Sequence, residues 1–114
     1  DDKGEVVMVV GAAGGPTIPV HTARAIIGVV DFEMSAKEAL SLPLIMAFGQ
    51  TVVYEKGSVI ERMEAQLKAL GHTQIRSFGA PLKSIALRRS NDTNGAVCWD
   101  AAREPRVEPL LVYE

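Results

Sequence analysis

A run of apolar residues that ends in a cluster of glycines constrains the fold of this chain more than any other feature. The segment reads Val6-Val7-Met8-Val9-Val10-Gly11-Ala12-Ala13-Gly14-Gly15-Pro16-Thr17. It predicts a strand over 6–10, a tight turn over 11–16 and a helix that begins after Thr17 as its N-cap, with Pro19 in the first turn. Because the strand does not alternate apolar and polar residues, we expect it to be buried on both faces.

The glycine turn is also where we expect a reactive centre to lie, if the protein has one. Backbone N–H groups in such a turn, next to a helix N-terminus, can converge on an anion or on a developing oxyanion. The same glycines could serve only to make a turn, and the residues alone leave both interpretations open.

A third interpretation of this segment is a dinucleotide-binding loop. Gly11 and Gly14 follow the predicted strand, and Asp31 lies twenty positions beyond Gly11. That motif requires a glycine where Thr17 stands and an acidic residue that closes a second strand. Asp31 instead lies between two predicted helices, which disfavours nucleotide binding.

Size and charge exclude several classes of function. The chain has 114 residues, of which 47% are hydrophobic, which is the length of one domain with enough apolar residues for a core. Its 12 basic and 14 acidic residues are mixed along the sequence, so no basic patch for nucleic acid or for an anionic membrane is expected. No apolar run is long enough to span a bilayer.

Since the chain begins without Met or a signal-like segment, we expect it to come from the interior of a longer product, and its compartment stays open.

The cysteine and the histidines do not form a recognisable metal or nucleophile pattern. Cys98, the lone cysteine, excludes an internal disulfide and a cysteine-based zinc site, and its apolar neighbours predict a buried structural thiol. His21 has no ligating partner three or four residues away, and His72 is expected to cap a helix end or to be exposed. The sequence therefore predicts no metal and no cofactor.

The long helix is predicted from its apolar positions. They extend from Thr17 to about Phe32 and cover most of the helix surface, so we expect this helix to lie between two layers. Gly28 in its middle costs about 1 kcal/mol of helix propensity relative to alanine. Close packing against another backbone is the expected reason for this glycine.

Two further helices are predicted from capping signals. A capping box over 35–38 predicts a short helix over 36–41 that ends before Pro43. A second signature over 58–61 opens an amphipathic segment with Gly71 as its C′ residue.

The remaining segments predict strands and turns. Strands are expected over 51–54, 74–76, 82–88 and 96–99, a hairpin turn over 91–95, an extended loop over 101–109 and a tail or edge strand over 110–113. The order β, α, α, β, α followed by strands predicts an α+β layered fold with incomplete edges.

Several motifs stand in a fixed order along nearly the whole chain. They are the strand with Gly11-x-x-Gly14-Gly15, then Met34-Ser35-Ala36-Lys37-Glu38-Ala39, Val53-Tyr54-Glu55-Lys56-Gly57, Leu67-Lys68-Ala69-Leu70-Gly71-His72, Lys83-Ser84-Ile85, and Asp100 with Arg103-Glu104-Pro105-Arg106. Their order and spacing together resemble the C-terminal part of the small subunit of a γ-glutamyltransferase (γ-glutamyltranspeptidase).

This resemblance implies a fragment, residues 1–114, of an N-terminal-nucleophile hydrolase with an αββα sandwich made by autocleavage. In such an enzyme a new N-terminal threonine attacks the γ-glutamyl amide of glutathione or a related compound, and the acyl group passes to water or to an amino acid or peptide. Gly14 and Gly15 would then form the backbone oxyanion hole. The nucleophile lies upstream in the family and does not map onto Thr17 or Thr22, so the isolated chain is expected to be inactive. Its implied partners are the upstream part of the small subunit, the large subunit and a small γ-glutamyl substrate.

Two departures from the family pattern keep alternatives open. Ala12-Ala13 and Pro16 replace residues that are usually Ser-Pro and Ser, and 42–47 lacks a Pro-Arg-Phe-His-like segment. A diverged acylase or amidase of the same superfamily is one alternative, and a self-contained α+β binding domain with a structural glycine loop is another. The bacterial family would imply a periplasmic or secreted protein, with a cytoplasmic location as the alternative.

Overall fold

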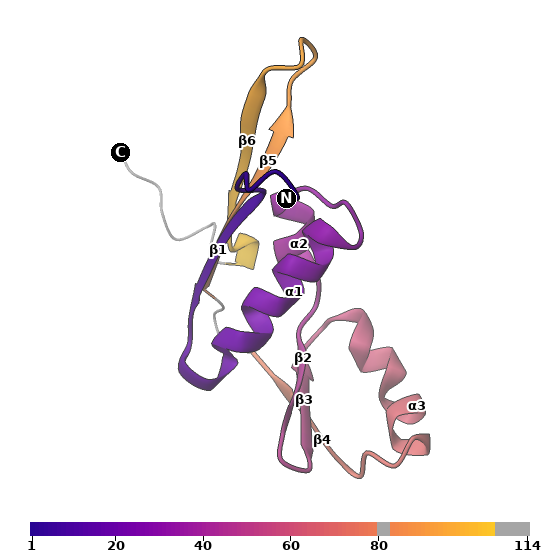
Figure 1. Ribbon diagram of the computed structural model, residues 1–114. Helices are drawn as coiled ribbons and strands as arrows, with labels where there is room; N and C mark the ends of the chain where they lie inside the picture. Colours follow the sequence, from indigo (N-terminus) through magenta and orange to yellow (C-terminus); the bar gives the residue numbers. More distant parts are fainter. Residues whose placement is uncertain (80–82, 107–114) are drawn as a thin grey trace, which may run out of the picture. The chain divides into compact units, whose positions relative to one another are not determined.

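The computed structural model of the chain describes residues 1–79 and 83–106 (Figure 1). These residues form two compact units. The first contains residues 1–42 and 83–106, and the second contains residues 43–79.

The first unit is an antiparallel sheet with two helices on one face (Figure 1). The strand order is β1 (Met8–Ala13), β5 (Lys83–Asn91), β6 (Val97–Arg103). The helices are α1 (Ile18–Val30), which follows the short 3₁₀ helix η1 (Gly15–Thr17), and α2 (Ala36–Ser41). The predicted β5–β6 hairpin is confirmed, but β6 continues to Arg103, so the first part of the predicted loop after residue 100 is strand.

Strand β1 differs from its prediction in position and in burial. It begins later than expected and continues through Gly11, Ala12 and Ala13, which were predicted to form the turn. Burial on both faces is wrong among the described residues, because the two helices cover only one face of the sheet. Val9 points away from the helices and is 51% exposed, and Ile85 on the same face is 52% exposed.

The core of the first unit lies between the sheet and the helices. Ala25, Ala36, Leu40 and Ala86 are fully buried, and Met8, Val10 and Ala102 pack against them. Among residues 1–79 and 83–106, helix α1 packs against this one layer and not between two as predicted, and its opposite face carries exposed Ile26, Ile27 and Val30.

Gly28 has the role that its sequence position predicts. A Cβ at this position would lie 2.8 Å from the Cβ of Ala39 and 3.1 Å from its Cα. The glycine therefore allows α1 and α2 to approach more closely than an alanine would permit.

Helix α2 has the predicted bounds and is held at its N-terminus from two sides. The Ser35 hydroxyl accepts a hydrogen bond from the Glu38 N–H at 3.2 Å, and the Glu38 carboxylate accepts one from the Ser35 N–H at 2.9 Å. Asp100 on β6 adds a carboxylate oxygen 2.6 Å from the Ala36 nitrogen. The capping box is confirmed, and Asp100 was not foreseen as part of the cap.

The second unit is a sheet in the order β2 (Ile45–Phe48), β3 (Thr51–Glu55), β4 (Gln74–Phe78). Strands β2 and β3 are antiparallel, and β3 and β4 are parallel. Strand β2 was not predicted, because its residues do not alternate. A two-residue turn at Gly49 and Gln50 joins β2 to β3, and Gly49 has a φ of 58°, as such hairpin turns require.

The crossover between β3 and β4 contains the 3₁₀ helix η2 (Val59–Met63) and the helix α3 (Glu64–Ala69). The predicted capping box is wrong here: the Ser58 side chain makes no cap hydrogen bond, and Glu61 accepts from the Gly57 N–H at 3.0 Å. The predicted helix end is confirmed. Gly71 has a φ of 98°, and the N–H groups of Gly71 and His72 donate to the carbonyls of Lys68 and Leu67.

The last two sequence-based predictions concern the C-terminal tail and membrane-spanning segments. The predicted tail or edge strand over 110–113 lies outside the described residues. Among the residues that are described, no helix has the length and apolar character needed to cross a membrane.

Candidate functional site

The turn between β1 and α1 holds two consecutive glycines in conformations that other residues avoid. Gly14 has a φ of 139° and Gly15 a φ of 61°, and both are exposed. A Cβ at Gly14 would also lie 2.6 Å from the Thr17 hydroxyl, whereas one at Gly15 would meet no atom within 4 Å. Glycine is therefore required at the first position by conformation and space, and at the second by conformation.

Thr17 stabilises this turn through contacts with the Gly14 carbonyl. It stands at the N-cap position of α1 as predicted, but its side chain makes no cap hydrogen bond. Its hydroxyl instead donates to the Gly14 carbonyl at 3.0 Å, and its backbone N–H points to the same oxygen at 3.4 Å. Pro19 lies in the first turn of α1, as predicted.

The amides of Gly14 and Gly15 have no hydrogen-bond acceptor among residues 1–79 and 83–106. They lie just before the N-terminus of α1, where the helix dipole favours negative charge. Exposed backbone donors at this position can serve an incoming anion or oxyanion.

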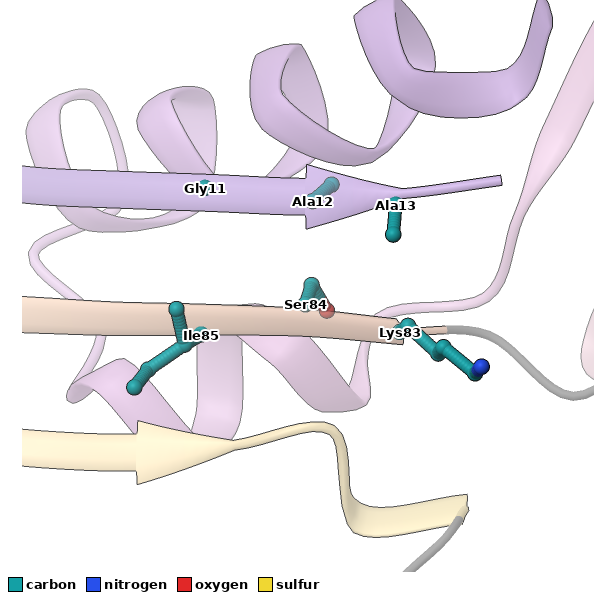
Figure 2. Close-up of a pocket in the computed structure, with 6 residues that line it drawn as sticks. All are labelled: Gly11, Ala12, Ala13, Lys83, Ser84 and Ile85. Atoms are coloured by element: carbon teal, nitrogen blue, oxygen red, sulfur yellow. The ribbon is translucent and has the colours of Figure 1, made fainter. Parts of the chain in front are cut away.

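A pocket of about 430 Å³ adjoins this turn. Figure 2 shows its lining, which comes from the end of β1 and the start of β5: Gly11, Ala12, Ala13, Lys83, Ser84 and Ile85. Ala13 pairs with Lys83 in the sheet and directly precedes Gly14. The pocket and the free amides therefore lie at the same end of the sheet, with a wall made mostly of small and aliphatic side chains.

Neither threonine near the turn has the surroundings of a nucleophile. The Thr17 hydroxyl is bonded to Gly14, and that of Thr22 donates to the carbonyls of Ile18 and Pro19 at 3.1 and 3.0 Å. Thr22 is a helix residue as predicted, and Thr17 stands at the predicted N-cap position but without the cap hydrogen bond.

The dinucleotide-binding interpretation is wrong. Asp31 is the C-cap of α1 and closes no strand. Strand β1 pairs antiparallel with β5, whereas that motif needs a parallel strand after the helix.

The two histidines and the cysteine lie in three separate segments of the chain. His72 is exposed after α3, and the thiol of Cys98 is half-buried, 3.0 Å from the Ser90 hydroxyl. His21 in α1 is fully buried, and its ring nitrogens have no hydrogen-bond partner among the residues that the structure describes. Within residues 1–79 and 83–106, no three His, Cys, Asp or Glu side chains gather as metal ligands.

Sequence reasoning missed a buried ion cluster formed by Arg24, Glu104 and Arg106. One Glu104 oxygen lies 2.6 Å from Arg106, and the other lies 3.4 Å from Arg24 and 2.7 Å from the Ser84 hydroxyl. Glu104 is 1% exposed. Its pairing with Arg24 spans 80 positions, so the local pattern could show only a lone arginine within an apolar helix.

The pKa of Glu104 reflects this pairing. Burial alone would raise it, but hydrogen bonds from Arg106 and Ser84 and the charges of the two arginines outweigh burial and lower it. Glu104 is therefore a carboxylate at neutral pH, as a buried ion cluster requires.

Comparison with known proteins places this geometry in a family. The sequence profile described as Gamma-glutamyltranspeptidase matches residues 1–109. A crystal structure of a Helicobacter pylori γ-glutamyltranspeptidase mutant superposes with a TM-score of 0.78 at 25% identity and covers 90% of this chain and 55% of that chain. The cephalosporin acylase of Bacillus halodurans shares the fold with a TM-score of 0.68 at 22% identity, over 85% of this chain and 18% of that chain.

Among curated proteins, the Acylase ACY 1 proenzyme of Pseudomonas sp. (strain SE83) is 28% identical over 105 residues, which are 90% of this chain and 19% of that protein. The chain thus spans about half of the solved γ-glutamyltranspeptidase chain and a fifth of the acylase proenzyme. The expected α+β fold of an N-terminal-nucleophile hydrolase is confirmed by these likenesses. Because the family's sequence profile matches residues 1–109, nearly the full length of the chain, the chain belongs to the γ-glutamyltranspeptidase family.

Proposed function

We propose that this chain supplies the oxyanion-binding loop of a γ-glutamyltransferase-like enzyme that cleaves γ-glutamyl amides such as glutathione. The exposed amides of Gly14 and Gly15 carry this proposal, because they have no acceptor among the described residues and adjoin a pocket. In the reaction, a nucleophile attacks the amide carbonyl and its oxygen becomes negatively charged. Two converging backbone donors stabilise that charge in the transition state.

The nucleophile in this proposal is a threonine on an upstream segment, exposed as a new N-terminus by autocleavage, with its own amine as the base. The acyl-enzyme then passes its acyl group to water or to an amino acid or peptide. Thr17 and Thr22 are unsuited to this role, since their hydroxyls are bonded to carbonyls of their own segment.

The whole domain in this proposal includes chain beyond residues 1–114, namely the upstream part of the small subunit and the large subunit. The open face of the β1–β5–β6 sheet supports this view. Val9, Ile85 and Trp99 lie on that face and are 51%, 52% and 44% exposed. A second sheet of an αββα sandwich would cover them, as apolar sheet faces require.

A diverged acylase of the same superfamily is the second candidate. Two observations favour it: the curated relatives are acylases, and Ala12 and Pro16 stand where the γ-glutamyltransferase pattern has serines. A pocket wall without those polar groups would select less strictly for the amino group of a γ-glutamyl donor.

Assays of the full-length, self-cleaved protein separate the two candidates. We expect release of the chromophore from a γ-glutamyl anilide, and a slower reaction with the glutaryl anilide, which lacks only the amino group. A faster reaction with the glutaryl compound would assign the protein to the acylases. If correctly cleaved protein released chromophore from neither compound, amide cleavage of this class would be the wrong function.

A further inference from the structure

The pocket in Figure 2 lies at the end of the sheet next to the glycine turn, on the face that the described helices leave open. Gly11 and Ala13 on β1 are paired with Ile85 and Lys83 on β5. Residues directly opposite each other in a sheet share a face, and Ile85 is 52% exposed there. Ser84 lies between Lys83 and Ile85 in sequence and is only 8% exposed, as expected for the helix side. The two pairs therefore surround a hollow that opens away from the helices.

Small residues leave this hollow unfilled. Gly11 has no side chain, and a Cβ added to it would lie 3.9 Å from Cγ2 of Ile85, in ordinary contact. Ala13 contributes only a methyl group. Stacked sheets lie about 10 Å apart, and large side chains normally fill the space between them. Under the second sheet of the proposed sandwich, the space over Gly11 and Ala13 therefore stays open to a ligand.

Lys83 is the one charged residue in the lining of this pocket. Its side chain is exposed, and Figure 2 shows it extending away from Ile85 toward the end of the sheet, where β1 runs into the glycine turn. Among residues 1–79 and 83–106, no carboxylate lies within ion-pair distance of its ammonium. An ammonium at the edge of an apolar pocket attracts an anionic group and can donate charge-assisted hydrogen bonds to it.

The spacing between Lys83 and the glycine amides fits a short dicarboxylic acyl group. Directly opposite residues on antiparallel strands have Cα atoms about 4.5–5.5 Å apart, and Lys83 is opposite Ala13, the residue before Gly14. In an extended chain of five carbons, such as a glutaryl group, the end carbons lie about 5 Å apart. A carbonyl at the Gly14 and Gly15 amides therefore brings the far carboxylate of such a group within reach of the flexible lysine side chain.

We propose that Lys83 determines specificity by binding a carboxylate at the far end of the acyl group, while the scissile carbonyl lies at Gly14 and Gly15. The substrates are then amides of a five-carbon acyl group with a carboxylate opposite the amide, which both γ-glutamyl and glutaryl compounds have. This inference rests on the proposed function and adds the residue and the charge that select the acyl group. Because both compounds carry the carboxylate, Lys83 does not distinguish between them.

Kinetics of the full-length, self-cleaved protein test this assignment with pairs of anilides that differ only in charge. One member carries the free carboxylate, and in the other a carboxamide of nearly the same shape replaces it. The pair is made in both the γ-glutamyl and the glutaryl series. Lys83→Met removes the ammonium and keeps a long side chain, and Lys83→Arg keeps the positive charge. Lys37→Met is the matched control, because Lys37 is also exposed but lies on α2, on the other face of the sheet.

In Lys83→Met, we expect kcat/KM to fall about tenfold for the carboxylate substrate and to stay within about twofold for the carboxamide, since a hydrogen bond to a charged group is lost only in the first case. The loss should appear mainly in KM, because the carboxylate has the same charge in the ground state and the transition state. Lys83→Arg and Lys37→Met should keep the preference for the carboxylate. A Lys83→Met variant that also keeps this preference, or that slows both substrates equally, would overturn the assignment.

A binding measurement separates this assignment from the proposed reaction. Glutarate is titrated into the full-length protein by calorimetry, where no turnover is needed. We expect the wild type and Lys37→Met to bind it equally and Lys83→Met to bind it about tenfold more weakly. Lys83-dependent binding without amide cleavage would support the assignment and contradict the proposed function. Equal binding by the wild type and Lys83→Met would overturn the assignment, and so would the absence of both binding and cleavage.

Discussion

At several positions of the first unit, the available space and the backbone conformation determine which residue type fits, more than polarity does. Gly14, Gly15 and Gly28 are the clearest cases. The first two have positive φ angles, and the third lies where a methyl group would overlap Ala39. The sequence predicted all three positions, because glycines after a strand and within an apolar helix each have a short list of physical causes.

The contact of Gly28 with α2 gives a prediction at this scale. Gly28→Ala gains about 1 kcal/mol of helix propensity, but its Cβ would lie 2.8 Å from the Cβ of Ala39. Overpacking of this kind costs about 1–3 kcal/mol, so we expect a net loss of unfolding free energy in denaturant titrations. The added substitution Ala39→Gly removes the opposing methyl and should recover part of the loss. A Gly28→Ala variant more stable than the wild type would show that the helices are not in close contact here.

At the scale of elements, local signals predicted what local contacts determine. The Ser35–Glu38 capping box gave α2 its correct bounds, and Gly71 gave the end of α3. Strand β2 was missed because its residues lack alternation, and Ser58 was misjudged because Glu61 bonds to Gly57 instead. The buried ion cluster could not be found locally, since Arg24 and Glu104 meet only in the folded sheet and helix layers.

The cap that Asp100 adds to α2 gives a prediction at the element scale. Its carboxylate accepts from the Ala36 N–H at 2.6 Å from a separate strand. Asp100→Ala leaves that helix N–H without this acceptor and should cost about 1 kcal/mol of unfolding free energy. Asp100→Asn keeps an acceptor oxygen and should cost less. Equal losses in the two variants would mean that the cap hydrogen bond does not account for the effect.

For the whole molecule, the exposed apolar residues are the informative feature. One face of the β1–β5–β6 sheet and the outer face of α1 carry Val9, Ile85, Ile27 and Val30 at 46–57% exposure. A composition with 47% hydrophobic residues predicted a core, but it could not show that a core built by these residues alone leaves such faces open. The proposed incomplete domain accounts for them.

The isolated chain tests that proposal. We expect residues 1–114, expressed alone, to self-associate or to bind a dye specific for exposed apolar surface, because large exposed apolar patches favour association. Charge substitutions on the open face, such as Val9→Lys with Ile85→Glu, should reduce this association. Sedimentation velocity measures it. A monomeric chain with sharp cooperative unfolding would favour the self-contained binding domain instead.

The central claim is that the Gly14 and Gly15 amides stabilise the oxyanion, and single-turnover acylation of the full-length protein by a γ-glutamyl anilide tests it most directly. Gly15→Ala strains the backbone that presents the amide, and a misplaced oxyanion donor costs about 10²–10³-fold in rate. Gly95→Ala is the matched control, since Gly95 also has a positive φ and also meets no atom within 4 Å of an added Cβ. We predict a slower acylation step in Gly15→Ala and an unchanged one in Gly95→Ala. An acylation rate of Gly15→Ala equal to that of the wild type, or an equal loss of rate in both variants, would contradict the account.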